Sequence, residues 1–174
     1  SRKKYDHQGF KHFTITEFNQ YVNWDEILKG VKNIVHTAAC VHQMSKPAMN
    51  DLKLFREVNT LGTINLYKQA VENKVERFVF LSTIGVCGSE TIEPFNEKSP
   101  ENPKTLYSKS KLEAEKSLIS LAKKSETKLI IIRPPMIIGP NAPGNFAKLV
   151  NVINRNLPLP LRSVEFNKKS FLSI

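Results

Sequence analysis

Three short apolar segments, separated by longer amphipathic ones, constrain the fold of this chain more than any other feature. The apolar segments lie at residues 33–39, 77–81 and 128–132. Residues 51–73 and 106–124 lie between them and carry apolar side chains at helical spacing. Strands that alternate with helices in this way predict an α/β domain with a parallel sheet and right-handed crossovers.

The apolar pattern also predicts which faces of the strands and helices are buried. After Lys128 the third strand is apolar throughout, which is typical of a parallel strand covered on both sides. Further elements are expected as a helix at 145–156 and a strand at 170–174. The predicted inward residues of the first two helices are Leu54, Val58, Leu61 and Asn65 in one, and Leu112, Ile119 and Ala122 in the other.

Composition narrows the class of protein. The apolar fraction is 40% and the charged fraction 24%, as in soluble globular proteins. No apolar run approaches the roughly 20 residues of a membrane span. Cys40 and Cys87 lack metal-ligand spacing, so the sequence predicts no metal site, and we expect both thiols to be reduced in a cytoplasmic protein.

The net charge of +10 allows two interpretations. It can reflect a solvated, lysine-rich surface, or it can attract an anionic partner such as a diphosphate. The lysines are spread along the chain rather than gathered in one stripe with aromatic residues, so no nucleic-acid partner is expected. Residues 148–174 are one-sided in charge, because five basic residues there accompany the single acid Glu165.

Residues suited to chemistry follow the predicted strands, where ligands bind in parallel sheets. The small residues Ala38 and Ala39 end the first segment, and Thr83 follows the second. Tyr107 and Lys111 are four residues apart in the next helix, so their side chains share one face. An ammonium beside a phenol favours the phenolate, so we expect Lys111 to lower the pKa of Tyr107 toward the range of a general base.

Several motifs occur in a characteristic order around these residues. Asn-Thr-Leu-Gly-Thr-Ile-Asn-Leu occupies 59–66, Ser-Thr at 82–83 precedes Val-Cys-Gly at 86–88, and Tyr-Ser-Lys-Ser-Lys occupies 107–111. Arg-Pro and Gly-Pro pairs follow near 133 and 139. In this combination the chain resembles the extended short-chain dehydrogenase/reductases, and among them the NAD-dependent nucleotide-sugar epimerases and dehydratases. The resemblance implies a Rossmann-like, doubly wound parallel sheet.

The resemblance also implies roles for particular residues. Tyr107 would be the catalytic acid/base, Lys111 would support it and hold the nicotinamide ribose, and Thr83 would complete the triad and contact substrate. Cofactor contacts would include Ala38, Ala39 and Pro134, with NAD expected and NADP possible. The diphosphate of a nucleotide sugar would meet Asn145, Phe146 and Lys169. Relatives commonly form homodimers, which implies the same partner here.

The reaction is narrowed by the residues after Thr83. Dehydratases that resemble this family place Asp-Glu there, whereas this chain has Ile84 and Gly85, which disfavours dehydration. Epimerisation at C4 of a UDP-linked hexose or N-acetylhexosamine, for polysaccharide precursors, remains the leading expectation. A 4-keto-sugar reductase or a non-catalytic remnant are the alternatives.

The glycine loop that binds the cofactor pyrophosphate has no counterpart in the sequence. The seven glycines form no such loop. We therefore expect 1–174 to be a partial NAD-binding domain, truncated at both ends, with its first strand absent and its sugar-binding region beginning at about 140. On this view the chain enters the fold at a strand near 11–16 and binds NAD poorly.

Overall fold

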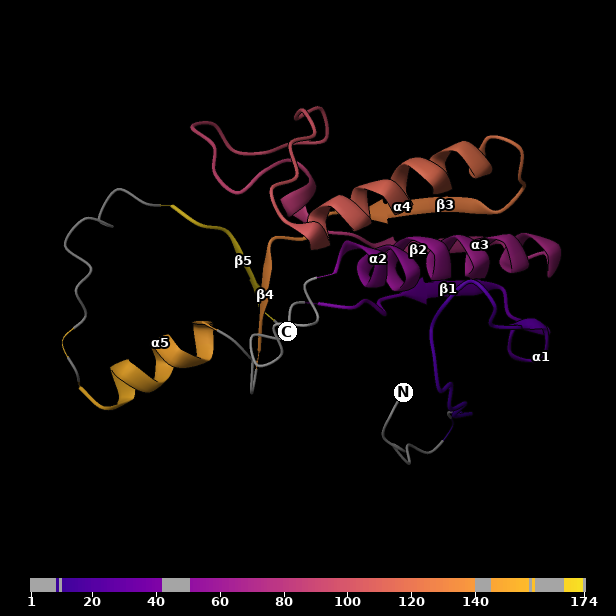
Figure 1. The fold of residues 1–174 in the computed structure, drawn as a ribbon, viewed down its shortest axis with the longest axis horizontal. Coiled ribbons are helices and arrows are strands. Elements are labelled where there is room, and N and C mark those ends of the chain that lie inside the picture. The colour runs from indigo at the N-terminus through magenta and orange to yellow at the C-terminus, as the bar shows by residue number, and fades with distance from the viewer. Residues whose placement is uncertain are drawn as a thin grey trace. The chain divides into compact units, whose positions relative to one another are not determined.

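The structure is a computed structural model that describes residues 9, 11–41, 51–139, 145–156, 158 and 168–173. The chain divides into two compact units, Ser1–Arg133 and Pro134–Ile174. Each unit is described separately below. Figure 1 shows the elements of both along the chain.

The first unit contains a parallel three-stranded sheet. Its strands are β1 (Asn33–His36), β2 (Arg77–Leu81) and β3 (Lys128–Ile132), in the order β1-β2-β3. His36 is paired with Phe80 in register, and Phe80 with Ile131, so the carboxyl ends of all three strands share one edge. The predicted α/β fold with a parallel sheet is confirmed.

Helices connect these strands as the sequence predicts. Between β1 and β2, α2 (Leu52–Phe55) continues through a π-helical segment (Arg56–Gly62) into α3 (Thr63–Glu72). Between β2 and β3 lie a short 3-10 turn (Ile84–Val86) and α4 (Leu106–Ala122). A short helix, α1 (Asp25–Leu28), precedes β1. Helix α4 starts where it does because the Thr105 side chain accepts a hydrogen bond from the Ser108 amide.

The buried stripe of the helix between β1 and β2 differs from the predicted one. Leu61 is 37% exposed, and Leu54, Val58 and Asn65 are only half-buried. The π-helical turn adds a residue to the repeat and so rotates the stripe. Small and polar side chains then face inward, which a hydropathy pattern does not reveal. The buried residues of this helix are Phe55, Asn59, Thr60, Gly62, Thr63, Leu66, Tyr67 and Ala70.

Helix α4 also buries an unexpected face. Leu112 is buried and Ala122 is half-buried, but Ile119 is 45% exposed. Its inward stripe is instead largely polar, because it lies against the ends of the strands. That stripe comprises Ser108, Ser110, Lys111, Leu112, Ala114, Glu115 and Leu118.

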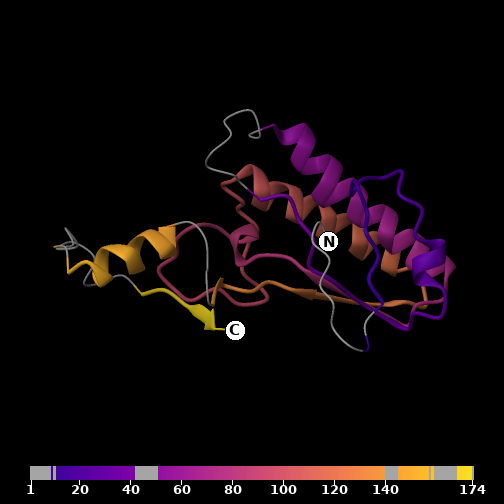
Figure 2. The same cartoon turned by 90° about the horizontal axis from the view of Figure 1, so that it is seen from below.

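The core of the first unit lies between the sheet and its helices. Figure 2 shows α3 and α4 on one face of the strands. Phe78 and Phe80 point into this layer and are fully buried. On the other face Val35, Ile130 and Ile132 are 68%, 43% and 44% exposed, so the predicted two-sided cover of the third strand is wrong among the described residues.

The predicted strand at 11–16 is also wrong. These residues have no regular secondary structure. A strand needs a neighbour to satisfy its backbone groups, and β1 pairs only with β2 within the described part of the chain.

The second unit contains one helix and a two-stranded sheet. Helix α5 (Asn145–Asn154) matches the predicted helix, and β5 (Phe171–Ser173) matches the predicted last strand. Strand β4 (Met136–Ile138), which the sequence analysis missed, is paired in parallel with β5. Across the described residues of both units, none of the helices combines the length and apolarity of a membrane span.

Candidate active site

The loop after β2 carries Thr83 and lies against the start of α4. The Thr83 hydroxyl accepts a hydrogen bond from the Gly85 amide at 3.1 Å, which caps the 3-10 turn. A Cβ at Gly85 would lie 3.4 Å from the hydroxyl oxygens of both Thr83 and Ser108. The Thr83 hydroxyl therefore lies close to the first turn of α4, which contains Tyr107 and Ser108.

Lys111 is buried where α4 crosses the sheet. Only 1% of the residue is exposed, and its Nζ lies 4.0 Å from the centre of the Phe80 ring. Burial lowers the pKa of Lys111 to about 8, while the charge of Glu115 acts in the opposite direction. Lys111 is thus a buried ammonium that loses its proton more readily than an ordinary lysine.

Tyr107 is half-buried one turn before Lys111. Burial raises the pKa of Tyr107, so the predicted lowering by Lys111 is wrong for this structure. The reason is that removal from water disfavours the phenolate, while the Lys111 ammonium lies against the Phe80 ring.

His36, at the end of β1, packs in the core. It is 4% exposed, stacks between Phe18 and Phe80, and shares a 2.8 Å hydrogen bond with Thr63. Burial, and then the charge of Lys111, lower its pKa to about 3. His36 is therefore neutral at physiological pH.

Asn59, in the π-helical segment, ties the end of β1 to α4. It accepts a hydrogen bond from the Cys40 amide at 2.7 Å and donates to the Cys40 carbonyl and to the Ser110 hydroxyl, both at 3.0 Å. Ser110 in turn donates to the backbone carbonyl of Tyr107 at 2.8 Å. This chain of bonds joins the segment containing Ala39 to the helical turn containing Tyr107.

Other residues of the 59–66 motif have defined roles in packing. A Cβ at Gly62 would lie 2.7 Å from the Phe18 ring, so only glycine lets the two segments approach. Asn65 donates to the Val22 carbonyl at 2.7 Å. The stretch therefore holds α3 against its neighbours.

A second buried charge on α4 was not anticipated from the sequence. Glu115 is 1% exposed, and Arg133, at the end of β3, donates to both of its carboxylate oxygens. The signal was present in the spacing, since Glu115 is four residues beyond Lys111 on the same helical face.

Five of the predicted site residues gather at the carboxyl edge of the sheet. Ala38 is exposed and Ala39 half-buried directly after β1, and Thr83, Tyr107 and Lys111 lie as described above. The other four belong to the second unit. Pro134 is half-buried and Lys169 exposed, while the side chains of Asn145 and Phe146 lie outside the described residues.

The buried polar groups at this edge fit a ligand that carries hydroxyls. Within the described part of the chain, the Lys111 ammonium has no hydrogen-bond or ion-pair partner. The buried Ser82 hydroxyl, next to Thr83, also lacks one. Such groups are rare because each costs free energy, and a ligand can satisfy them. The ribose hydroxyls of a nicotinamide dinucleotide suit this donor set.

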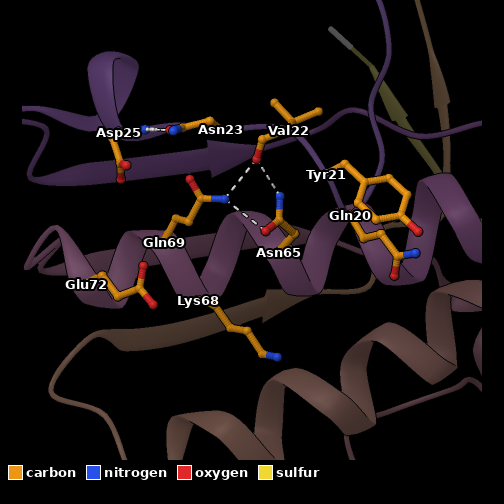
Figure 3. A pocket seen from close by; sticks show the side chains of 9 residues that line it. All are labelled: Gln20, Tyr21, Val22, Asn23, Asp25, Asn65, Lys68, Gln69 and Glu72. Atoms are coloured by element: carbon orange, nitrogen blue, oxygen red, sulfur yellow. Dashed lines mark hydrogen bonds between the residues drawn. The ribbon is translucent and has the colours of Figure 1, made fainter.

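A separate hollow of about 350 Å³ lies between the segment before α1 and helix α3, and none of the predicted site residues lines it. Figure 3 shows Asn65 and Gln69 converging on the Val22 carbonyl there. Gln69 also accepts a hydrogen bond from the Trp24 amide at 2.6 Å. These bonds anchor the loop to α3, which is a structural role.

A sequence model described as the NAD dependent epimerase/dehydratase family matches residues 1–164. With the parallel sheet and the Tyr-x-x-x-Lys helix already in place, this match means that the chain belongs to that family. The predicted resemblance is confirmed.

Curated relatives support the same assignment. The chain is 41% identical over 164 residues to a UDP-glucose 4-epimerase of Vibrio cholerae, covering 93% of this chain and 50% of that protein. It is 32% identical over 131 residues to the N-acetyl-alpha-D-glucosaminyl-diphospho-ditrans,octacis-undecaprenol 4-epimerase of Escherichia coli O157:H7, covering 74% of this chain and 38% of the relative. The chain therefore spans about half, or less, of the length of these relatives.

Solved structures share the fold. The dTDP-glucose 4,6-dehydratase DesIV from Streptomyces venezuelae, solved with NAD bound, is 28% identical, with a TM-score of 0.71 over 86% of this chain and 46% of that one. The UDP-glucuronic acid 4-epimerase from Bacillus cereus has a TM-score of 0.69 at 20% identity, over 80% of this chain and 44% of its own. These similarities confirm the Rossmann-like architecture.

Proposed function

We propose that this protein uses NAD to epimerise C4 of a UDP-linked hexose or N-acetylhexosamine. The observation that carries the proposal is the buried, partnerless Lys111 ammonium one helical turn from Tyr107, beside the loop that holds Thr83. The similarity to a UDP-glucose 4-epimerase supports the same reaction and substrate class.

Each residue of the site has a distinct task in this proposal. Tyr107 takes the proton of the sugar 4-hydroxyl and later returns it, while the Thr83 hydroxyl holds the reacting oxygen by a hydrogen bond. Lys111 donates hydrogen bonds to ribose hydroxyls. NAD, when bound, accepts a hydride from the sugar and returns it.

The burial of Tyr107 bears on its part in the reaction. Because desolvation raises the pKa of Tyr107, the phenol alone is a weak base at neutral pH. Lys111, whose Nζ lies against the Phe80 ring, is assigned to the ribose hydroxyls and not to the phenol. Lys111 must keep its proton to donate all of its hydrogen bonds to them.

The residue after Thr83 supports redox at a single carbon rather than dehydration. Ile84 packs against the small apolar cluster formed by Val86, Cys87 and Leu112. An apolar side chain at this point supplies no acid or base for the elimination of water. The dehydratase relatives thus share the fold, while the proposed reaction is epimerisation.

The second unit would bind the substrate diphosphate. Helix α5 starts at Asn145, and helix N-termini attract phosphate groups. Lys169 is exposed just before β5 and would add a positive charge. Contacts from Pro134 to the cofactor and from Phe146 to the nucleotide belong to the same proposal, as do a homodimer and a role in polysaccharide precursor synthesis.

Product analysis tests the proposal. The protein is incubated with UDP-glucose, and separately with UDP-N-acetylglucosamine, with NAD supplied and NADH withheld. We expect interconversion with the 4-epimer and no net change in NADH. A second reaction contains a 4-keto sugar and NADH. Stoichiometric NADH consumption there, with no epimer in the first reactions, would contradict epimerisation and identify a reductase. A folded protein that turns over neither substrate would identify a non-catalytic remnant.

A further inference from the structure

The buried ion pair between Glu115 and Arg133 lies one helical turn from Lys111. Arg133 donates from Nε to both Glu115 oxygens at 3.1 Å and from Nη2 to one of them at 2.5 Å. The Glu115 side chain is 1% exposed and that of Arg133 is 24% exposed. Arg133 also contacts the Cys87 sulfur at 3.7 Å, so its guanidinium is fixed on two sides.

A neighbouring pair on the same helix shows what is unusual about this one. Arg56 also donates from Nε and Nη2 to a glutamate, Glu113, at 2.8 and 2.6 Å. That pair is exposed to solvent, with side-chain exposures of 51% and 36%, and such pairs contribute little. Burying the Glu115 carboxylate carries a large desolvation cost. The ion pair with Arg133 need not stabilise the fold enough to offset it, so the burial calls for another explanation.

The charges around Lys111 show what Glu115 supplies. Desolvation disfavours the Lys111 ammonium, and Glu115 opposes that effect. On the other side, His36 of β1 is neutral, and Phe80 of β2 presents only its ring face. Tyr107 contributes no charge while its phenol is protonated. Glu115 is therefore the negative charge that favours the ammonium among the described groups packed around it.

We propose that Glu115, fixed by Arg133, is a positioning residue that keeps Lys111 charged inside the interface between α4 and the sheet. A charged Lys111 can then donate hydrogen bonds to ligand hydroxyls at neutral pH. This last step rests on the proposed function, whereas the effect of Glu115 on Lys111 does not. Arg133 prevents Glu115 from forming a direct ion pair with Lys111, which leaves the ammonium available.

The titration of Lys111 by NMR tests the proposal without any ligand. The Lys111 side-chain signal is assigned as the one absent from Lys111→Arg, and its midpoint is followed with pH. We expect a midpoint near the value of about 8 in the native chain. In Glu115→Gln it falls by about one pH unit, because the opposing charge is gone. Glu113→Gln is the matched control and leaves it unchanged.

Further variants separate positioning from packing. Glu115→Asp keeps the charge and restores most of the midpoint. If Glu115→Gln does not fold, the double variant Glu115→Gln/Arg133→Gln also removes the neighbouring cation, so its midpoint falls by less than in the single variant. A folded Glu115→Gln, or in its place a folded double variant, with an unchanged midpoint overturns the proposal, even where its thermal stability is reduced.

NADH affinity then connects the charge to binding. At pH 7.5 a midpoint lowered by one unit leaves about one third as much charged Lys111, so Glu115→Gln binds NADH about three-fold more weakly. The difference in NADH affinity disappears near pH 6, where Lys111 is charged in both proteins. If the native chain binds no NADH, the proposed function fails, and the Lys111 midpoints still decide the role of Glu115.

Discussion

Polar groups at the two ends of the three-stranded sheet differ in whether they have hydrogen-bond partners. At the amino ends of β2 and β3, the Thr127 hydroxyl donates to the Val75 carbonyl at 2.7 Å, and Tyr67 donates to the Thr127 carbonyl at 3.2 Å. At the carboxyl ends, the buried Ser82 hydroxyl lacks a hydrogen-bond partner within the described residues, and the Lys111 ammonium lies against the Phe80 ring. The two amino-end hydroxyls named here hold the fold, whereas these two carboxyl-end groups are available for a ligand.

This contrast has an energetic meaning. A buried hydrogen bond at the amino end contributes about 1 kcal/mol, whereas each partnerless group at the carboxyl end costs about 1–3 kcal/mol. The sheet therefore gives up stability where the proposed chemistry takes place. Substitutions at matched positions can test whether the two ends differ as stated.

The two tyrosines provide the strongest test. Tyr107→Phe is expected to lower turnover about 10²- to 10⁴-fold, because it removes the proposed acid/base, while unfolding free energy changes little. Tyr67→Phe is expected to leave turnover unchanged and to lower stability by about 1 kcal/mol, because it removes the bond to Thr127. Steady-state kinetics and urea unfolding measure both. Equal kinetic losses in the two variants would remove the distinction between the ends.

Acid sensitivity is expected to come from His36 at the carboxyl end of β1. Its pKa is about 3 in the folded chain and about 6.5 unfolded, so the unfolded state binds the proton first as pH falls. The contribution of neutral His36 to the unfolding free energy is fully present above pH 6.5. It is lost as pH falls toward 3, by roughly 5 kcal/mol in total. His36→Gln should flatten the dependence of unfolding free energy on pH. An unchanged slope would contradict the burial of a neutral His36.

Lys111→Met should stabilise the chain. Because the folded pKa is about 8 against 10.5 unfolded, the buried ammonium costs about 3 kcal/mol below pH 8. This destabilisation decreases as pH rises from 8 to 10.5, because Lys111 loses its proton. The increase in unfolding free energy caused by Lys111→Met is therefore largest at pH 7 and smaller at pH 10. Lys109→Met, at an exposed position on the same helix, is the control. Urea unfolding at both pH values measures it, and a variant less stable than the native chain at pH 7 would disagree.

Two hydroxyls give the smallest effects. Thr127→Ala should lower unfolding free energy by about 1–2 kcal/mol, because the Val75 carbonyl is left buried without its donor. Ser82→Ala should raise it by about 1 kcal/mol or more, because a buried hydroxyl without a partner is removed and no bond is lost. Thermal unfolding of the two variants side by side is sufficient. A loss of stability in Ser82→Ala would mean that its hydroxyl is already engaged.

How far the sequence predicts the structure also differs between regions. The three strands and the helices between them were predicted, because their apolar periodicity is strong. The buried stripes were not, since Asn59 and Glu115 are polar residues on inward faces and hydropathy assigns such residues to the surface. Their roles depend on partners distant in sequence, such as Cys40 for Asn59 and Arg133 for Glu115.

The candidate site follows from the sequence as a set of residues, which stays a prediction, whereas its electrostatics do not. Motif order identified Thr83, Tyr107 and Lys111, and parallel strands bring their segments to one edge. The direction of the Tyr107 pKa was wrong because burial is a property of the packed structure. The strand expected at 11–16 failed for a related reason, since a strand requires a partner that local sequence does not reveal.

Titration of NADH into the 174-residue chain, followed by nicotinamide fluorescence, shows most directly whether the carboxyl edge of the sheet binds the cofactor. We expect saturable binding. We also expect that Lys111→Ala abolishes binding, while Lys116→Ala, at an exposed position on the same helix, retains it. Equal binding by Lys111→Ala, or no binding by the folded native chain, would contradict a cofactor site at the carboxyl edge of this sheet.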